Sequence, residues 1–136
     1  MAIRIVRLGS PRNRDEGVRI GTVRRPPRGV RKEDYARLDY YDTWLPQLAP
    51  SAPLVKMAQD SRAVPGAWKQ FEKKYRQELS SPDSLRVLDL LAALSKQADF
   101  SVGCYCEEES TCHRSVLRKV LAERGAVIGE VPAIVR

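Results

Sequence analysis

The segment that most constrains the fold is an apolar strand followed by an amphipathic helix near the C-terminus. Residues 99–105 alternate so that Phe100, Val102 and Cys104 share one face, which predicts a buried strand. A Ser-Thr turn follows, and a helix is predicted from Cys112, with an apolar stripe at positions 116, 117, 120 and 121 and Gly125 at its end. In open α/β sheets, ligands bind where such a strand ends and the next helix begins.

Further strands and helices are predicted along the rest of the chain. Strands are predicted over 2–8, with an edge position as one option, over 18–23 and at 126–128. Helices are predicted over 32–45, 51–59 and 66–79, and another from about residue 83. Because strands and helices alternate, we predict an α/β fold with a small, mostly parallel sheet and helices packed on it. We expect a single domain over 1–128 and a C-terminal tail over 129–136.

Positive charge is concentrated in the first quarter of the chain. The 136 residues have a formal net charge of +7, and residues 1–32 hold nine arginines and one lysine against Asp15 and Glu16. A local positive field attracts phosphates, nucleic acids or acidic partners. An arginine-rich surface that contacts only water has the same composition, so charge alone leaves both interpretations open.

Composition also argues against several classes of protein. No apolar run approaches the roughly 20 residues of a membrane span, and residues 1–14 lack the apolar core and cleavage site of a signal peptide. Three cysteines, an odd number, argue against a disulfide framework. We therefore expect a cytoplasmic protein without membrane association. The oligomeric state is left open.

All three cysteines and the single histidine lie between residues 104 and 113. The spacing Cys-x-Cys-x5-Cys-His supplies residue types that bind zinc, but it lacks the paired knuckles of structural zinc sites. Cys112 and His113 are adjacent, and on a helix their side chains would diverge by about 100°. Cys104 is interpreted as a strand residue that belongs to the core. We therefore predict no metal ligands and no cofactor.

A reactive thiol is the second interpretation of this stretch. A helix N-terminus and the neighbouring Arg114 favour the thiolate of Cys112, whereas the three glutamates at 107–109 oppose it. Cys112 would then be the catalytic nucleophile and His113 its proton carrier. Catalytic Cys-His pairs usually come from residues distant in sequence, so enzymatic activity is left open.

Anion binding is the third interpretation. The free N–H groups of a helix N-terminus bind phosphate or carboxylate, and Arg114 and Ser115 lie in the first turn of the predicted helix. Arg24 and Arg28 would join them if the N-terminal strands lie alongside in the sheet. We predict these four residues as the ligand-binding set because this interpretation also explains the charge asymmetry. A non-catalytic interaction module, in which the cysteines only pack, remains the plainest alternative.

Four segments resemble, in order, the domain-of-unknown-function family 488 and its YeaO-like branch. They span roughly residues 2–123, and the resemblance implies a small cytosolic α/β protein of unestablished activity. It nominates Arg24, Arg28, Cys104, Cys112, His113 and Arg114. From the N-terminus, the segments are residues 23–33 (VRRPPRGVRKE), residues 44–51 (WLPQLAPS), Trp68-x2-Phe71-x3-Tyr75-Arg76-x-Glu78-Leu79 and Cys104-x7-Cys112-His113-Arg114.

The chain departs from that family at two positions. Cys106 stands where many members carry an acidic residue, and Val23 stands where an aspartate is common. The charge asymmetry and the predicted helix N-terminus lead to our main hypothesis, which is binding of a phosphorylated small molecule or nucleic acid at an arginine-lined helix N-terminus.

Overall fold

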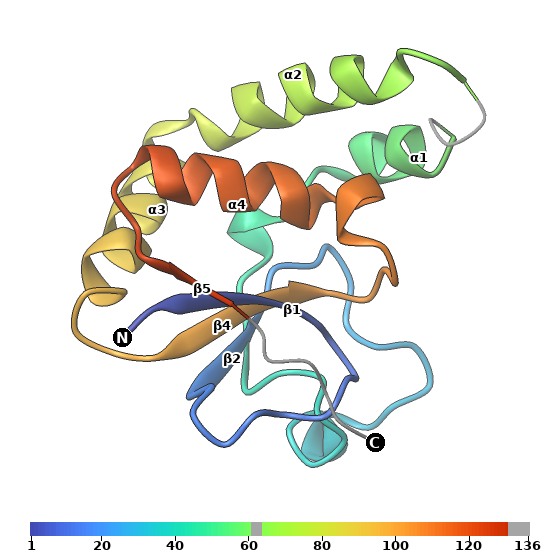
Figure 1. Ribbon diagram of the computed structural model, residues 1–136. Helices are drawn as coiled ribbons and strands as arrows, with labels where there is room; N and C mark the ends of the chain where they lie inside the picture. The colour runs from blue at the N-terminus through green and yellow to red at the C-terminus, as the bar shows by residue number, and fades with distance from the viewer. Residues whose placement is uncertain (61–63, 131–136) are drawn as a thin grey trace.

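Five strands form the sheet of this computed structural model, which describes residues 1–60 and 64–130 (Figure 1). All their pairings are parallel, and their order is β3-β2-β4-β1-β5. The predicted α/β class is confirmed. The strands are β1 (Ile3–Arg7), β2 (Val18–Gly21), β3 (Thr43–Trp44), β4 (Phe100–Cys104) and β5 (Ile128–Gly129).

The central position of β4 follows from its sequence. Every residue of this strand is buried, as expected for a strand covered on both faces of a parallel sheet. Gly103 permits close packing, since a Cβ at this position would lie 2.7 Å from the carbonyl oxygen of Val6. The edge position considered for the first strand is wrong, because β1 lies between β4 and β5.

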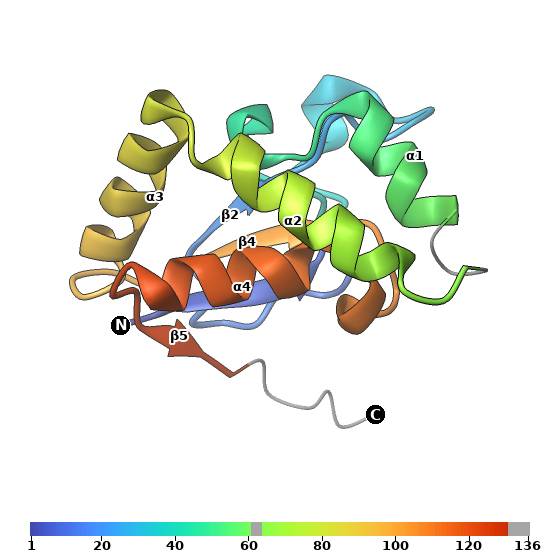
Figure 2. The ribbon, with the colours of Figure 1, turned by 90° about the horizontal axis from the view of Figure 1, so that it is seen from above.

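Four helices cover one face of the sheet (Figures 1 and 2). In α2, Phe71, Tyr75 and Leu79 are spaced four apart and buried, so one stripe of the helix faces the core. The hydroxyl of Ser81 caps α3 by accepting a hydrogen bond from the Ser84 N–H at 3.3 Å. The helices are α1 (Ala52–Asp60), α2 (Ala67–Leu79), α3 (Pro82–Leu94) and α4 (His113–Glu123). None of the described helices is both long and apolar enough to cross a membrane.

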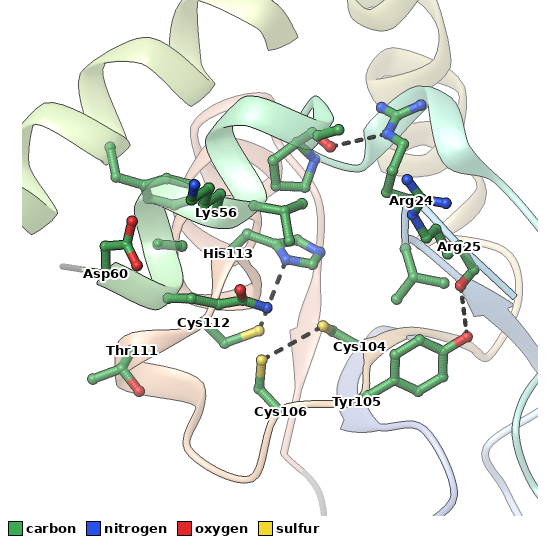
Figure 3. A pocket seen from close by; sticks show the side chains of 17 residues that line it. Arg24, Arg25, Lys56, Asp60, Cys104, Tyr105, Cys106, Thr111, Cys112 and His113 are labelled. Carbon is green, nitrogen blue, oxygen red and sulfur yellow. Dashed lines mark hydrogen bonds between the residues drawn. The ribbon is translucent and has the colours of Figure 1, made fainter. Parts of the chain in front are cut away.

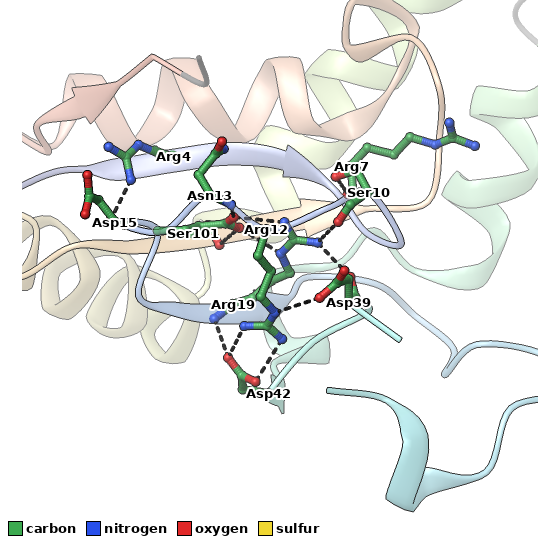
Figure 4. Close-up of polar contacts among 11 residues, drawn as sticks. Arg4, Arg7, Ser10, Arg12, Asn13, Asp15, Arg19, Asp39, Asp42 and Ser101 are labelled. Atoms are coloured by element: carbon green, nitrogen blue, oxygen red, sulfur yellow. Dashed lines mark hydrogen bonds and ion pairs between the residues drawn. The ribbon is translucent and has the colours of Figure 1, made fainter. Parts of the chain in front are cut away.

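The opposite face is covered by connecting segments and contains a buried ion pair. Nε of Arg19, on β2, lies 2.7 Å from a carboxylate oxygen of Glu16, and both side chains are 1% exposed. The same guanidinium donates to the carbonyl oxygens of Ser10 and Asp39, at 2.8 and 2.6 Å. The hydroxyl of Ser101, on β4, donates to Glu16 at 2.7 Å. A polar network thus fills the place of a second helical layer (Figure 4).

A second group in this network ties the connecting segments together. Arg12 donates to both carboxylate oxygens of Asp42, at 2.7 and 2.9 Å, and to Asp39 at 3.3 Å. Arg4 donates to the carbonyl of Asp15 at 2.6 Å. Several arginines of the basic N-terminal quarter therefore stabilise the fold, which accounts for part of the charge asymmetry.

The helix predicted over 32–45 is wrong. The segment forms a 3-10 helix at Lys32–Asp34, then turns, and enters β3 at Thr43. Asp39 adopts a left-handed conformation with φ 62°, and its carbonyl accepts hydrogen bonds from Gly9 and Arg19. These long-range contacts replace the hydrogen bonds of a helix. Leu38, which the periodic pattern places in the core, is 41% exposed.

The C-terminal tail expected over 129–136 falls mostly outside the described residues. Gly129 belongs to β5, and Glu130 is the last residue described. The strand predicted at 126–128 is confirmed at Ile128, shifted toward Gly129.

Candidate functional site

The cysteine-rich segment connects the carboxyl end of β4 to the N-terminus of α4. Cys104 is the last residue of β4, and Cys112 is the N-cap residue of α4, with extended backbone angles of φ −119° and ψ 151°. The helix predicted from Cys112 is therefore confirmed to within one residue. Two of the intervening glutamates form ion pairs directed elsewhere: Glu109 with Arg118 at 2.6 Å, and Glu107 with Arg7 at 3.7 Å.

The three cysteine sulfurs form one cluster (Figure 3). The Sγ atoms of Cys104, Cys106 and Cys112 all lie within 4.8 Å of one another, and the first two are 3.9 Å apart. The prediction that Cys104 lies on a strand and in the core is confirmed, and its sulfur also belongs to this cluster. One signal could have indicated part of the cluster: Cys104 and Cys106 are two apart at the end of a strand, where side chains two apart point to the same side, and their sulfurs lie 3.9 Å apart.

His113 is fixed beside this cluster. Its Nε2 lies 2.7 Å from the carbonyl oxygen of Thr22, and its Nδ1 lies 3.9 Å from Sγ of Cys112. Burial lowers the pKa of His113 to about 4, so the imidazole is neutral at pH 7. Because a carbonyl only accepts, the hydrogen bond to Thr22 places the ring proton on Nε2 and leaves a lone pair on Nδ1. The predicted divergence of the Cys112 and His113 side chains is wrong. Cys112 is the extended N-cap residue and not part of the helix, and its Sγ faces Nδ1 of His113.

Cys112 has the most stable thiolate of the cluster. Hydrogen bonds from the thiols of Cys104 and Cys106 lower its pKa, burial opposes them, and the backbone N–H and charge of Arg114 add to the lowering. The pKa of Cys104 is raised by its hydrogen bonds to Cys106 and Cys112, and by burial. A single negative charge in the cluster therefore resides on Cys112.

Arg114 and Ser115 lie behind the cluster. Arg114 is 3% exposed, and its Nη2 donates to the carbonyl oxygen of Cys106 at 2.6 Å. Its Nε is buried and has no hydrogen-bond partner among the described residues. The hydroxyl of Ser115 donates to the Cys112 carbonyl at 2.9 Å. Both side chains thus contact the backbone of the cysteine segment from outside the pocket.

A pocket of about 580 Å³ opens in front of the cluster. It brings together Arg24, Cys112 and His113 from the predicted site, whereas Arg28 is exposed and lies outside its wall. Lys56, on α1, enters the wall without any sequence motif that could have indicated it. The lining residues are Val23, Arg24, Arg25, Pro50, Ala52, Val55, Lys56, Ala58, Gln59, Asp60, Phe71, Cys104, Tyr105, Cys106, Thr111, Cys112 and His113.

Arg24 is held rigidly in this wall. Its Nε donates to the carbonyl of Pro50 at 3.0 Å, and its Nη2 donates to the carbonyls of Ala49 and Pro46, at 2.9 and 3.2 Å. These bonds fix the segment before α1 against the end of β2. The positive charge of Arg24 therefore has a fixed place beside the pocket.

The comparison with protein families agrees with the resemblance found in the sequence. Residues 3–125 match the model of DUF488-N3a, described as the active DUF488-N3 subclade. Neither a curated protein nor a solved structure matches the chain. The match includes strands β1 to β4, the four described helices, the cysteine segment and the residues that line the pocket. Strand β5 lies beyond it. The chain therefore belongs to the DUF488 family.

Proposed function

We propose that the protein binds a small phosphorylated molecule in the pocket in front of Cys112. The observation that carries this proposal is the charge of the wall: among the described residues, three cations (Arg24, Arg25 and Lys56) outnumber the anionic groups Asp60 and Cys112. The N-terminus of α4 opens onto the same space and adds a partial positive charge. An anionic group placed there meets favourable potential from both sources.

The three cations have different mobility, which suits recognition of one phosphate. Arg24 is fixed by three carbonyl groups and supplies charge at a constant position. Arg25 and Lys56 are exposed, so their side chains can reorient toward a ligand. A preformed charge beside two adaptable donors lowers the ordering cost of binding.

The size and apolar part of the pocket favour a small molecule over a nucleic-acid strand. A volume of about 580 Å³ falls within the usual range of ligand pockets, roughly 300–1,000 Å³. Val23, Val55 and Phe71 supply apolar wall for the carbon skeleton of the ligand. Arg28 is exposed and lies outside this wall, so it does not contribute to the pocket.

Thermal unfolding at low salt tests the proposal. Inorganic phosphate, sugar phosphates and nucleoside monophosphates are the probes. A ligand at 100 times its Kd stabilises the folded state by about 2.7 kcal/mol, which raises Tm by several degrees. We expect Lys56→Gln and Arg25→Gln each to weaken binding about fivefold, equivalent to roughly 1 kcal/mol. Lys73→Gln, an exposed site on α2 outside the pocket, is the matched control.

Two results would contradict the proposal. One is that none of the probes raises Tm. The other is that single-stranded oligonucleotides bind more tightly than mononucleotides and that Arg28→Gln weakens them as much as Lys56→Gln. That second result would identify an extended nucleic-acid interface instead of the pocket.

A further inference from the structure

We infer that Cys104, Cys106 and Cys112 form a three-thiolate site for Zn²⁺ at the inner end of the pocket. The inference concerns an ion held by the protein itself and does not depend on the phosphorylated ligand. It rests on the spacing of the sulfurs, a buried positive charge next to them and access from solvent.

The spacing of the sulfurs approaches that of a tetrahedral zinc site. With Zn–S bonds of about 2.3 Å, two thiolates of a tetrahedral ion lie roughly 3.8 Å apart. Cys104 and Cys106 are separated by 3.9 Å, and all three sulfurs lie within 4.8 Å of one another. No sulfur pair therefore has to close by more than about 1 Å, which a small side-chain rotation provides.

His113 is held in a fixed orientation beside the cluster. Its Nε2–H is donated to the Thr22 carbonyl at 2.7 Å, and the lone pair of Nδ1 faces Cys112. Histidines that ligate a metal ion are often held by a backbone carbonyl in this way, but here Nδ1 is directed at Cys112. The ring nitrogens of His113 do not belong to the group of mutually close ligand atoms, which consists of the three cysteine sulfurs. We therefore assign three protein ligands and leave the fourth position to a ligand from the pocket.

Arg114 supplies the charge that such a centre requires. A dication with three thiolates carries a net charge of −1, and a buried guanidinium offsets it. Within the described residues Arg114 forms no ion pair with a carboxylate, and its buried Nε has no hydrogen-bond partner. A buried cation is strongly unfavourable without a nearby anionic group, and the cysteine cluster next to Arg114 supplies one.

Solvent access and ligand chemistry select the ion. All three cysteines line the pocket, so an ion can enter without unfolding of the chain. Thiolate ligands at tetrahedral spacing favour zinc over magnesium or calcium, which bind oxygen. The spacing Cys-x-Cys-x5-Cys differs from paired zinc knuckles because strand β4 and the N-cap of α4, rather than two loops, supply the ligands.

Metal content and Co²⁺ spectroscopy of the full chain test the inference. Under reducing conditions without chelator, we expect one equivalent of zinc per chain. Co²⁺ added to zinc-free protein is expected to give sulfur-to-cobalt charge-transfer absorption and the visible bands of a tetrahedral ion. Cys106→Ser is the main variant, because Cys106 is only half-buried and its replacement disturbs the fold least. We expect at least a tenfold loss of Co²⁺ and Zn²⁺ affinity and weaker charge-transfer absorption.

Thr111→Val serves as the control, since Thr111 lines the same pocket without a sulfur and is expected to retain wild-type affinity. Circular dichroism verifies that both variants fold. The inference is overturned if wild-type protein and Cys106→Ser bind Co²⁺ equally, or if no charge-transfer band appears. It is also overturned if Cys112 alkylates rapidly with iodoacetamide at the same rate with and without zinc, which would identify a free thiolate nucleophile. Phosphate binding by zinc-free protein would keep the proposed function intact in either case.

Discussion

Replacement of Glu16 by glutamine would test how far the polar network opposite the helices stabilises the sheet. The Glu16 carboxylate accepts from Arg19 at 2.7 and 2.9 Å, from the Ser101 hydroxyl at 2.7 Å and from the Asn13 N–H at 3.1 Å. Glutamine keeps the shape of the side chain but loses the charge and one acceptor oxygen. Arg19 then remains buried without a counter-charge.

The structure sets the expected magnitude. Removal of one member of a buried ion pair costs about 3–5 kcal/mol, and the retained amide oxygen places this variant near the lower value. A domain of this size has a free energy of unfolding of about 5–15 kcal/mol, so the loss is a large share of the total. With a urea m-value of about 1–3 kcal/mol/M, the unfolding midpoint should fall by roughly 1–3 M.

Urea unfolding followed by tryptophan fluorescence and far-UV circular dichroism measures this change. Arg86→Gln is the control, because Arg86 and Asp83 are 3.9 Å apart with side chains 80% and 97% exposed, and we expect no measurable change there. The double variant with Arg19→Gln should cost less than the sum of the two single variants. A loss below about 1 kcal/mol for Glu16→Gln, or additive losses in the double variant, would refute the reasoning.

Two further predictions concern stability. Burial raises the pKa values of Glu16 and Asp42, but hydrogen bonds from arginines outweigh it, so both pKa values lie below their ordinary values of 4.5 and 3.8. Each carboxylate therefore stabilises the folded state fully above its ordinary pKa, and this stabilisation is lost as the pH falls through its lowered pKa in the folded protein. Tm measured from pH 7 to pH 3 should fall at the acid end, and less steeply in Glu16→Gln; equal slopes would count against this. Gly103→Ala, whose Cβ would lie 2.7 Å from the Val6 carbonyl oxygen, should be destabilised by about 1–3 kcal/mol or more. Gly125→Ala, at φ +91° with open space around it, should lose only about 1 kcal/mol; urea midpoints in the reverse order would be inconsistent with this packing.

The elements that could be predicted from the sequence are those whose local pattern agrees with their packing. The spacing of Phe71, Tyr75 and Leu79 predicted α2, because those residues do form the buried stripe. The alternation in 99–105 predicted β4. The helix prediction for residues 32–45 was wrong because the conformation of this segment depends on distant partners. Asp42, for example, accepts hydrogen bonds from the Arg12 side chain and from the backbone of Arg19. No local pattern contains that information.

Only those parts of the candidate site that depend on local sequence could be predicted. The N-cap position of Cys112 is a local property and could be predicted. The contact between Cys104 and Cys112, and the entry of Lys56 into the pocket wall, depend on how β4 and α1 approach α4. The charge of the N-terminal quarter was linked to ligand binding through Arg24 and Arg28, whereas Arg12 and Arg19 of the same segment form ion pairs within the fold. Sequence gives the charge of a segment but not the direction of its side chains.

The strand order also has a consequence for how the chain folds. β1 and β2 follow each other in sequence, but β4 lies between them and joins residues 3–7 to residues 100–104. On a ribosome, β1 has no strand partner until most of the chain has emerged. Such long-range parallel pairing is slow, because the loop must close before any contact stabilises it. The pairing of β4 with β1 and β2 also fixes the place of Cys104, at the carboxyl end of the central strand and close to Cys112.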